Sequence, residues 1–162
     1  MTELEKRNFR VCFTGHRPEK LSRTEVEVKA DLEKEIRRAI ADGIFVFITG
    51  MARGVDIWAA EIVLQLRESG LPIKLICASP YDGFERGWKA SWQEKYTAVL
   101  KAADLVRFIN HGYSRSCFQI RNEWMVDHST RVIAVFDGTP GGTKNTIDYA
   151  RHKGVEVTLI DG

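Results

Sequence analysis

The stretch at residues 44–56, IFVFITGMARGVD, decides the fold class of this chain. Its first five residues form a continuous apolar run rich in β-branched and aromatic side chains, which is typical of a strand buried on both faces of a sheet. Thr49 and Gly50 end the run, and a helical pattern begins at Val55. A buried strand that passes through a short glycine-containing turn into a helix is the repeating unit of a parallel α/β sheet.

The same alternation extends along the rest of the chain. Further apolar runs cover Arg10–Thr14, Ile73–Ala78, Leu105–Ile109, Val132–Phe136 and Val155–Ile160. Helical patterns cover Thr24–Asp42, Val55–Glu68, Trp92–Ala103, Ile120–Asp127 and Thr146–His152. Because strands that alternate with helices are joined by right-handed crossovers, we expect a three-layer, Rossmann-like α/β fold. It should contain a mostly parallel sheet of about six strands with helices on both faces.

Composition favours one ordinary globular domain spanning residues 1–162. Hydrophobic residues make up 44% of the chain, and the formal net charge of +2 gives no argument for nucleic acid or a membrane as partner. No apolar run approaches the roughly 20 residues that span a bilayer. The three cysteines, Cys12, Cys77 and Cys117, form no paired motif and favour reduced thiols, so we expect a cytoplasmic protein without a metal site.

The positions that follow the apolar runs are the candidates for a binding site, because parallel sheets bind ligands beyond the carboxyl ends of their strands. After the first run these residues are Gly15, His16 and Arg17, and after the second they are Gly50, Met51, Ala52, Arg53, Gly54 and Asp56. After the third they are Ser79 and Tyr81, and after the fifth they are Asp137, Gly138, Gly141, Gly142, Thr143, Asn145 and Thr146.

Two of these loops favour a phosphate ligand. Gly50 and Gly54 permit a tight turn, and the free N–H groups at the start of the next helix attract anions. Gly141 and Gly142 repeat this arrangement in the last loop. The alternative is that glycine serves only the turns and that threonine or asparagine only caps a helix. Neither loop is a dinucleotide fingerprint or a Walker P-loop.

Side chains beside these loops suggest further roles. Arg17 and Arg53 are expected to contact phosphate. His16 is interpreted as a hydrogen-bonding residue rather than a proton carrier. A bulky residue in place of Gly54 is expected to weaken ligand binding before it unfolds the protein.

Four motifs together resemble the YpsA-like family, a branch of the SLOG superfamily. They are Phe13–Pro18 (FTGHRP), Ile48–Asp56 (ITGMARGVD), Arg121–Asp127 (RNEWMVD) and Asp137–Thr143 (DGTPGGT). The superfamily joins the DNA-processing protein A fold to the LONELY GUY phosphoribohydrolases. The resemblance implies a single SLOG, Rossmann-like nucleotide-binding domain that binds or senses a nucleotide or nucleotide-derived phosphate ligand.

The phosphoribohydrolases imply a second function, N-glycosidase action on nucleoside monophosphates. Arg121 fits their Arg-Lys-x-x-Met helix, with Asn122 replacing the lysine, and Asp148 stands where their loop motif carries a catalytic glutamate. In a hydrolase Arg121 would hold phosphate or ribose, while Asp148 or Glu123 would stabilise positive charge on the sugar. The aspartate is one methylene shorter than glutamate, which weakens this interpretation.

The DNA-processing relatives imply a third function, single-stranded nucleic acid binding, which usually needs a basic groove with stacking aromatics. We rank it last because no interleaving of aromatic and basic residues stands out in the sequence. No cofactor is required, and a nucleotide or an ADP-ribose-like molecule is the expected ligand. Relatives of the hydrolase type suggest a homo-oligomer.

Overall fold

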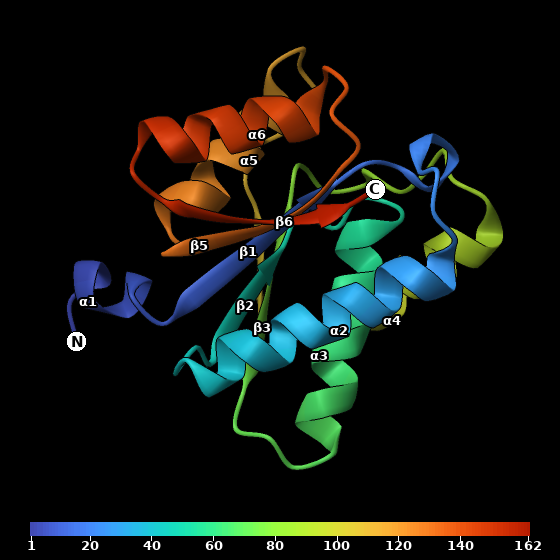
Figure 1. Ribbon diagram of the computed structural model, residues 1–162. Coiled ribbons are helices and arrows are strands. Elements are labelled where there is room, and N and C mark those ends of the chain that lie inside the picture. The colour runs from blue at the N-terminus through green and yellow to red at the C-terminus, as the bar shows by residue number, and fades with distance from the viewer.

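The computed structural model describes residues 1–162 as a sheet covered by helices on both faces (Figure 1). The strands are β1 (Arg10–Gly15), β2 (Val46–Thr49), β3 (Lys74–Ser79), β4 (Leu105–Phe108), β5 (Arg131–Phe136) and β6 (Glu156–Asp161). The α-helices are α1 (Glu3–Arg7), α2 (Glu25–Ala41), α3 (Val55–Glu68), α4 (Ala90–Ala102), α5 (Cys117–Asp127) and α6 (Gly142–His152). A short 3₁₀ turn, η1 (Pro18–Lys20), lies between β1 and α2.

All six strands pair in parallel, in the order β4-β3-β2-β1-β5-β6. The register places Cys12 of β1 opposite Ile48 of β2 on one side and Val132 of β5 on the other. From β1 the chain therefore adds β2, β3 and β4 on one side of the sheet. It then crosses to the other side of β1, where it adds β5 and β6. The predicted fold class is confirmed, and the sheet is entirely rather than mostly parallel.

This strand order fixes where a ligand can bind. The strand order reverses between β1 and β5, and open α/β sheets form their binding crevice outside the carboxyl ends of the strands at such a point. The loops that follow β1 and β5 flank this crevice directly, and the loop after β2 lies beside them.

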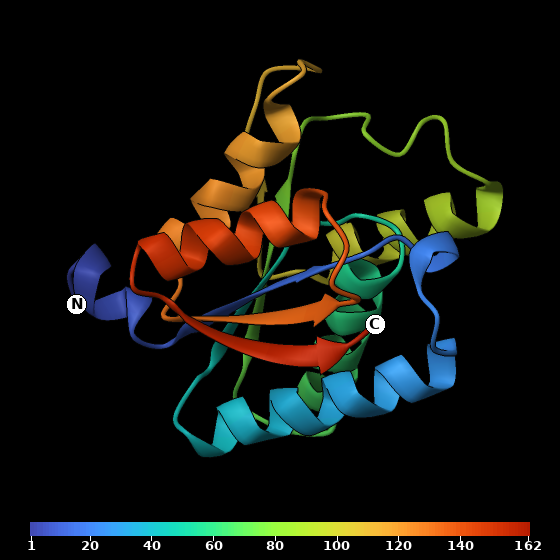
Figure 2. The same cartoon turned by 45° about the horizontal axis from the view of Figure 1, so that its top comes forward.

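The helices form two layers with separate cores (Figures 1 and 2). On one face α2, α3 and α4 cover the sheet, and Phe13, Phe47 and Leu75 point into this larger core. On the other face α5 and α6 pack against Cys12 and Ile48. Because neighbouring residues of one strand face opposite cores, the central strands are apolar at successive positions, such as Val11, Cys12 and Phe13 of β1, which explains the continuous runs in the sequence.

Several elements begin elsewhere than the sequence pattern indicates. Helix α6 begins at Gly142 rather than Thr146, and α5 begins at Cys117 rather than Ile120. Strand β2 is shorter than its apolar run and begins at Val46. Helix α1 was not expected, since its charged residues are all unburied and only a capping box from Thr2 marks its start. The earlier start of α6 matters for function, because it brings the first turn of the helix up to the Gly141 turn.

The three cysteines are free and buried, as expected. None of the helices combines the length and the apolar character that a membrane span requires.

Candidate functional site

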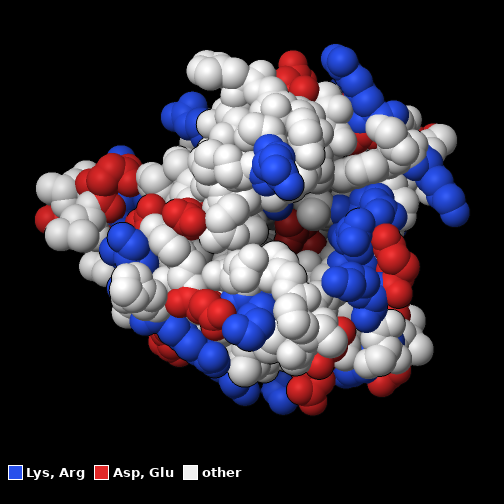
Figure 3. Space-filling view, turned by 90° about the horizontal axis from the view of Figure 1, so that it is seen from above, with Lys and Arg blue, Asp and Glu red and all other residues white.

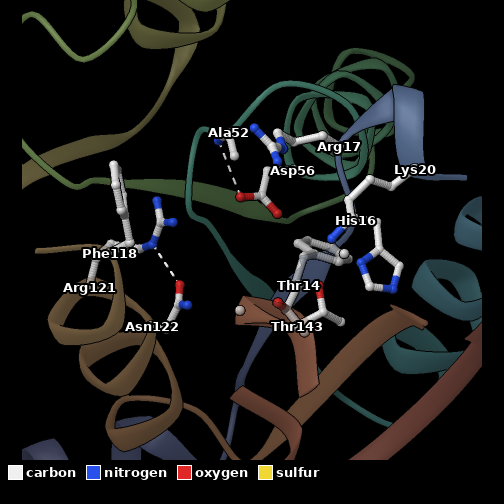
Figure 4. Close-up of a pocket in the computed structure, with 13 residues that line it drawn as sticks. Thr14, His16, Arg17, Lys20, Ala52, Asp56, Phe118, Arg121, Asn122 and Thr143 are labelled. Atoms are coloured by element: carbon white, nitrogen blue, oxygen red, sulfur yellow. Dashed lines mark hydrogen bonds between the residues drawn. The ribbon is translucent and has the colours of Figure 1, made fainter. Parts of the chain in front are cut away.

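A cavity of about 190 Å³ opens where the loops after β1, β2 and β5 meet the first turns of α5 and α6 (Figure 4). Its lining is mostly polar. It consists of Phe13, Thr14, Gly15, His16, Arg17, Lys20, Ala52, Asp56, Phe118, Arg121, Asn122, Gly142 and Thr143. The loops after the second and fifth runs of the sequence therefore meet at one cavity, as their positions in a parallel sheet predict.

Asp56 is the only carboxylate of the lining, and it is almost completely buried, with 5% of its surface exposed. Its Oδ2 accepts a hydrogen bond from the Ala52 N–H at 3.2 Å, while its Oδ1 is buried without a partner. The Thr49 hydroxyl donates to the Asp56 carbonyl at 2.8 Å and fixes the first turn of α3. Burial raises the pKa of the Asp56 carboxyl to about 6, against the opposing charge of Arg121.

Arg121 of α5 lies opposite this carboxylate and is also buried. Its Nε donates to Asn122 Oδ1 at 2.7 Å, and its Nη1 donates to the Gly50 carbonyl. Burial lowers the pKa of the guanidinium, and the nearby Asp56 raises it. A Cβ at Gly50 would lie 2.8 Å from Asp56 Oδ2 and 3.0 Å from Arg121 Nη1. Gly50 is thus required so that the acid and the guanidinium can approach each other across the backbone.

His16 links the loop after β1 to the loop after β5. Its Nε2 lies 2.8 Å from Asp137 Oδ1, and its ring stacks on Phe136 at a centroid distance of 5.8 Å. Asp137 Oδ1 also accepts hydrogen bonds from the Thr139 hydroxyl and N–H. These Thr139 bonds lower the pKa of Asp137, and His16 contributes further. The geometry gives His16 a hydrogen-bonding role that holds the two loops together.

The helices that begin at the cavity lack side-chain caps. Helices α3, α5 and α6 have no capping hydrogen bond, whereas α1 and α2, which begin elsewhere, carry full capping boxes. Helix α4, which also begins elsewhere, has no side-chain cap either. In α6 the first intrahelical bond runs from the Asn145 N–H to the Gly141 carbonyl. The N–H groups of Gly142 and Thr143 therefore have no acceptor within the helix, and such groups attract anions.

Two basic side chains, Arg17 and Lys20, line the cavity. Lys20 lies near the start of α6, since its Nζ is 3.9 Å from where a Cβ on Gly141 would stand. Figure 4 shows both side chains on the same side of the cavity as His16, with Phe118 and Arg121 on the other side. In Figure 3 basic side chains gather along one rim of a hollow, and acidic atoms lie in its depth. One rim of the cavity therefore carries the positive charges of Arg17 and Lys20, and Asp56 is the one carboxylate in the lining.

The cavity brings together many of the residues that the sequence singled out. Those that line it are Gly15, His16, Arg17, Ala52, Asp56, Arg121, Asn122, Gly142 and Thr143. Gly50 and Asp137 lie behind the lining and hold Arg121 and His16. No group of three or more His, Cys, Asp or Glu side chains is placed to hold a metal ion.

Other predicted residues have structural roles outside the lining. Met51 is fully buried in the core with φ of 66°, and Ser79 is buried against the Tyr96 hydroxyl at 2.7 Å. Thr146 donates to the Gly142 carbonyl within α6 at 2.8 Å, and Arg53 pairs with Glu19 at 3.0 Å. Also outside the lining are Tyr81, Gly138, Gly141 and Asn145.

Gly54 serves the shape of the loop. Its φ is 89°, and a Cβ there would lie 2.8 Å from Pro18 Cδ. A bulky residue at Gly54 would strain the backbone and collide with Pro18, so we expect it to lower stability as well as any binding.

The two carboxylates assigned to hydrolysis also lie outside the cavity. Asp148 is exposed on α6, where its Oδ2 pairs with Lys144 Nζ at 2.7 Å. Glu123 accepts a hydrogen bond from Gln119 on the same helix at 3.0 Å. The structure does not bring either side chain to Arg121.

Four residues of the lining were not predicted, namely Phe13, Thr14, Lys20 and Phe118. Thr14 could have been found, because it ends the first apolar run beside Gly15. Lys20 and Phe118 reach the cavity only through the path of η1 and the early start of α5. Neither feature has a clear signal in the sequence.

Comparison with known proteins places this chain in a family. The model of the YspA SLOG family (YpsA) matches residues 11–160. A UPF0398 protein of Bacillus thuringiensis (strain Al Hakam) is 30% identical over 154 residues, which is 89% of this chain and 83% of the relative.

Solved structures show the same fold in DNA-processing proteins. DNA processing protein A from Streptococcus pneumoniae superposes with a TM-score of 0.70 at 19% identity, over 96% of this chain and 51% of that protein. The chain therefore spans about half the length of that protein. The Helicobacter pylori protein, described with a single-stranded DNA binding mode, gives 0.67 at 19% identity, over 99% and 68% of the two chains. By the extent of the family match and the identity to its relatives, the chain belongs to the YspA SLOG family.

Proposed function

We propose that this domain binds or senses a nucleotide or nucleotide-derived phosphate ligand, with the phosphate held at the start of α6. The observation that carries the proposal is the uncapped first turn of α6, whose Gly142 and Thr143 amides meet Arg17 and Lys20 at one cavity. Free amides and a helix dipole favour an anion, and flexible basic side chains complete its charge neutralisation.

Asp56 supports a ligand that carries a sugar. A carboxylate repels phosphate, so this residue serves a different part of the ligand. Asp56 lines the cavity, its buried Oδ1 has no partner, and a ribose hydroxyl is the donor that would satisfy it. A polar cavity with an anion-binding end and one acidic floor residue matches a sugar phosphate.

The proposal requires no turnover. The hydrolase alternative assigns its carboxylates to Asp148 and Glu123. Neither residue lines the cavity, so neither would reach a ligand bound there. Incubation with nucleoside monophosphates followed by chromatography of released bases tests this alternative. Base release that Asp148→Ala abolishes would restore it.

Single-stranded nucleic acid is a second candidate ligand, and one observation favours it. The Helicobacter pylori neighbour is described as binding single-stranded DNA, and aromatic rings lie beside Arg17 and Arg53 at the edge of this cavity. Such rings stack on bases in single-strand binding proteins. A gel shift with oligothymidylate that weakens steeply with salt would support this function over mononucleotide binding.

Calorimetric titration with ribose 5-phosphate tests the proposed function. We expect binding to the native protein and a loss of roughly tenfold or more in affinity when Arg17 and Lys20 are both replaced by glutamine, because two charge-assisted contacts disappear. Lys144→Gln is the control, since Lys144 lies on α6 but pairs with Asp148 outside the lining. The proposal would be overturned if neither ribose 5-phosphate nor any of the four common nucleoside 5′-monophosphates binds, or if the double variant binds with the affinity of the native protein.

A further inference from the structure

The polar cavity continues into a second hollow of about 290 Å³. The two share Arg17, Ala52, Phe118 and Arg121, so they adjoin without an intervening element. The remaining lining of the second hollow is Arg53, Phe84 and Trp88. One site therefore has a polar compartment and an aromatic compartment.

The aromatic compartment is built from rings that hold one another in place. The Phe84 ring lies 5.0 Å from Trp88 and 5.6 Å from Phe118, measured between centroids. Trp88 packs edge-on, at 90°, against Tyr96, which is buried. Phe84, Trp88 and Phe118 are only half-buried. The contact of Trp88 with Tyr96 anchors the loop between β3 and α4, and part of each lining ring remains open to the hollow.

The charged side chains that line this hollow are all basic, namely Arg17, Arg53 and Arg121. Their acidic neighbours, Glu19 beside Arg53 and Asp56 opposite Arg121, do not line it. Flat apolar rings beside guanidinium groups are the surroundings in which an aromatic base stacks, by π contact and by cation–π attraction. A plain sugar phosphate would leave this compartment empty.

We propose that the hollow formed by Phe84, Trp88 and Phe118 is a base subsite, so that the ligand is a nucleotide with its aromatic base stacked there. This inference rests on the proposed function, which supplies the phosphate at α6 and the sugar at Asp56. The two compartments match the order of chemical groups in a nucleotide: phosphate, hydroxylated sugar and flat base.

Calorimetry with ribose 5-phosphate and the four common nucleoside 5′-monophosphates tests the subsite. At least one nucleotide is expected to bind roughly tenfold or more tightly than ribose 5-phosphate, because stacking of a base contributes an effect of this size. Phe84 lines the aromatic compartment and not the polar cavity. Phe84→Leu keeps an apolar side chain but removes the ring, so it should abolish most of this gain and leave the affinity for ribose 5-phosphate unchanged.

Tyr113→Leu is the matched control. Tyr113 contacts Phe118 at a centroid distance of 6.3 Å, yet it is 68% exposed and does not line the hollow. Its replacement should leave nucleotide affinity as in the native protein.

Three results would count against the subsite. If ribose 5-phosphate binds and no nucleotide binds more tightly, the subsite is refuted while the proposed function stands. If Phe84→Leu weakens the binding of ribose 5-phosphate and of nucleotides equally, the ring has a structural role and the subsite is also refuted. If none of the five compounds binds, the proposed function itself fails.

Discussion

At the scale of single residues, we expect the buried Asp56 carboxylate to carry a cost in stability. A buried carboxylate with one unpartnered oxygen loses its hydration without full compensation, and the attraction of Arg121 on α5 offsets this only in part. Such costs are concentrated at functional sites, which supports a role for Asp56 toward a ligand.

Replacing Asp56 by asparagine should therefore remove a pH-dependent loss of stability. The folded-state pKa of about 6 lies above the ordinary value of 3.8, so the folded protein binds more protons between these values and its stability falls as pH rises through them. Asp56→Asn should be more stable than the native protein by up to about 3 kcal/mol at pH 7, with the gap closing near pH 4. Urea unfolding of both proteins across this range measures it.

If the difference in unfolding free energy between Asp56→Asn and the native protein grew as pH fell, this account of Asp56 would be contradicted. The same variant should bind ribose 5-phosphate more weakly than the native protein, because an amide replaces the carboxylate as acceptor for the sugar hydroxyl. Higher stability with lower affinity separates this role from a merely structural one.

Gly54 illustrates a residue whose purpose the sequence alone misassigns. Gly54→Ala should lower the free energy of unfolding by about 1–3 kcal/mol, because its φ of 89° and the contact with Pro18 both disfavour a side chain. Gly138→Ala is the control, since Gly138 has a φ of 90° but open space around it, and its loss should be smaller. Equal losses in a urea titration would show that Pro18 does not restrict the site.

At the scale of elements, the first turn of α6 sets the anion-binding end of the cavity. Gly141, with φ of 142°, bends the chain into the helix without offering a capping side chain. The sequence indicates the turn through its paired glycines. It does not indicate that the helix begins at Gly142. Glycine is a poor helix former, so the sequence pattern alone does not place it within the first turn of a helix.

The register of α6 also explains why Asp148 is not part of the site. The buried face of the helix consists of Thr143, Thr146, Ile147 and Ala150. Asp148 lies on the opposite face, beside Lys144. A motif written as a spacing in sequence does not specify this rotation, which depends on where the helix begins.

A negative charge introduced at Gly142 should weaken phosphate binding without lowering the stability of α6. Gly142 has open space for a side chain, and an aspartate in the first turn interacts favourably with the helix dipole. Gly142→Asp should therefore fold at least as stably as the native protein and lose phosphate binding by roughly tenfold or more through charge repulsion. Gly142→Ser, which adds a side chain without charge, should retain binding. Loss of affinity in both variants would point to steric exclusion.

At the scale of the whole molecule, the parallel sheet and the edge that carries the site are predictable, and the cavity is only partly so. Continuous apolar runs such as Val132–Phe136 require cover on both faces, and this requirement leads to the Rossmann-like architecture. Strand order and the approach of Lys20 and Phe118 depend on packing between distant segments. No local pattern encodes that packing, so these two residues could not be found from sequence.

The central claim is that separate loops form one anion-binding cavity, and amide chemical shifts measure this most directly. Titration of ¹⁵N-labelled protein with ribose 5-phosphate should shift the amide signals of His16, Ala52, Gly142 and Thr143 together, with a single dissociation constant, because these residues line the same cavity. Signals of Lys101, on α4 and outside the cavity, should remain in place. Shifts confined to other surfaces, or no shifts at saturating concentrations, would contradict the account.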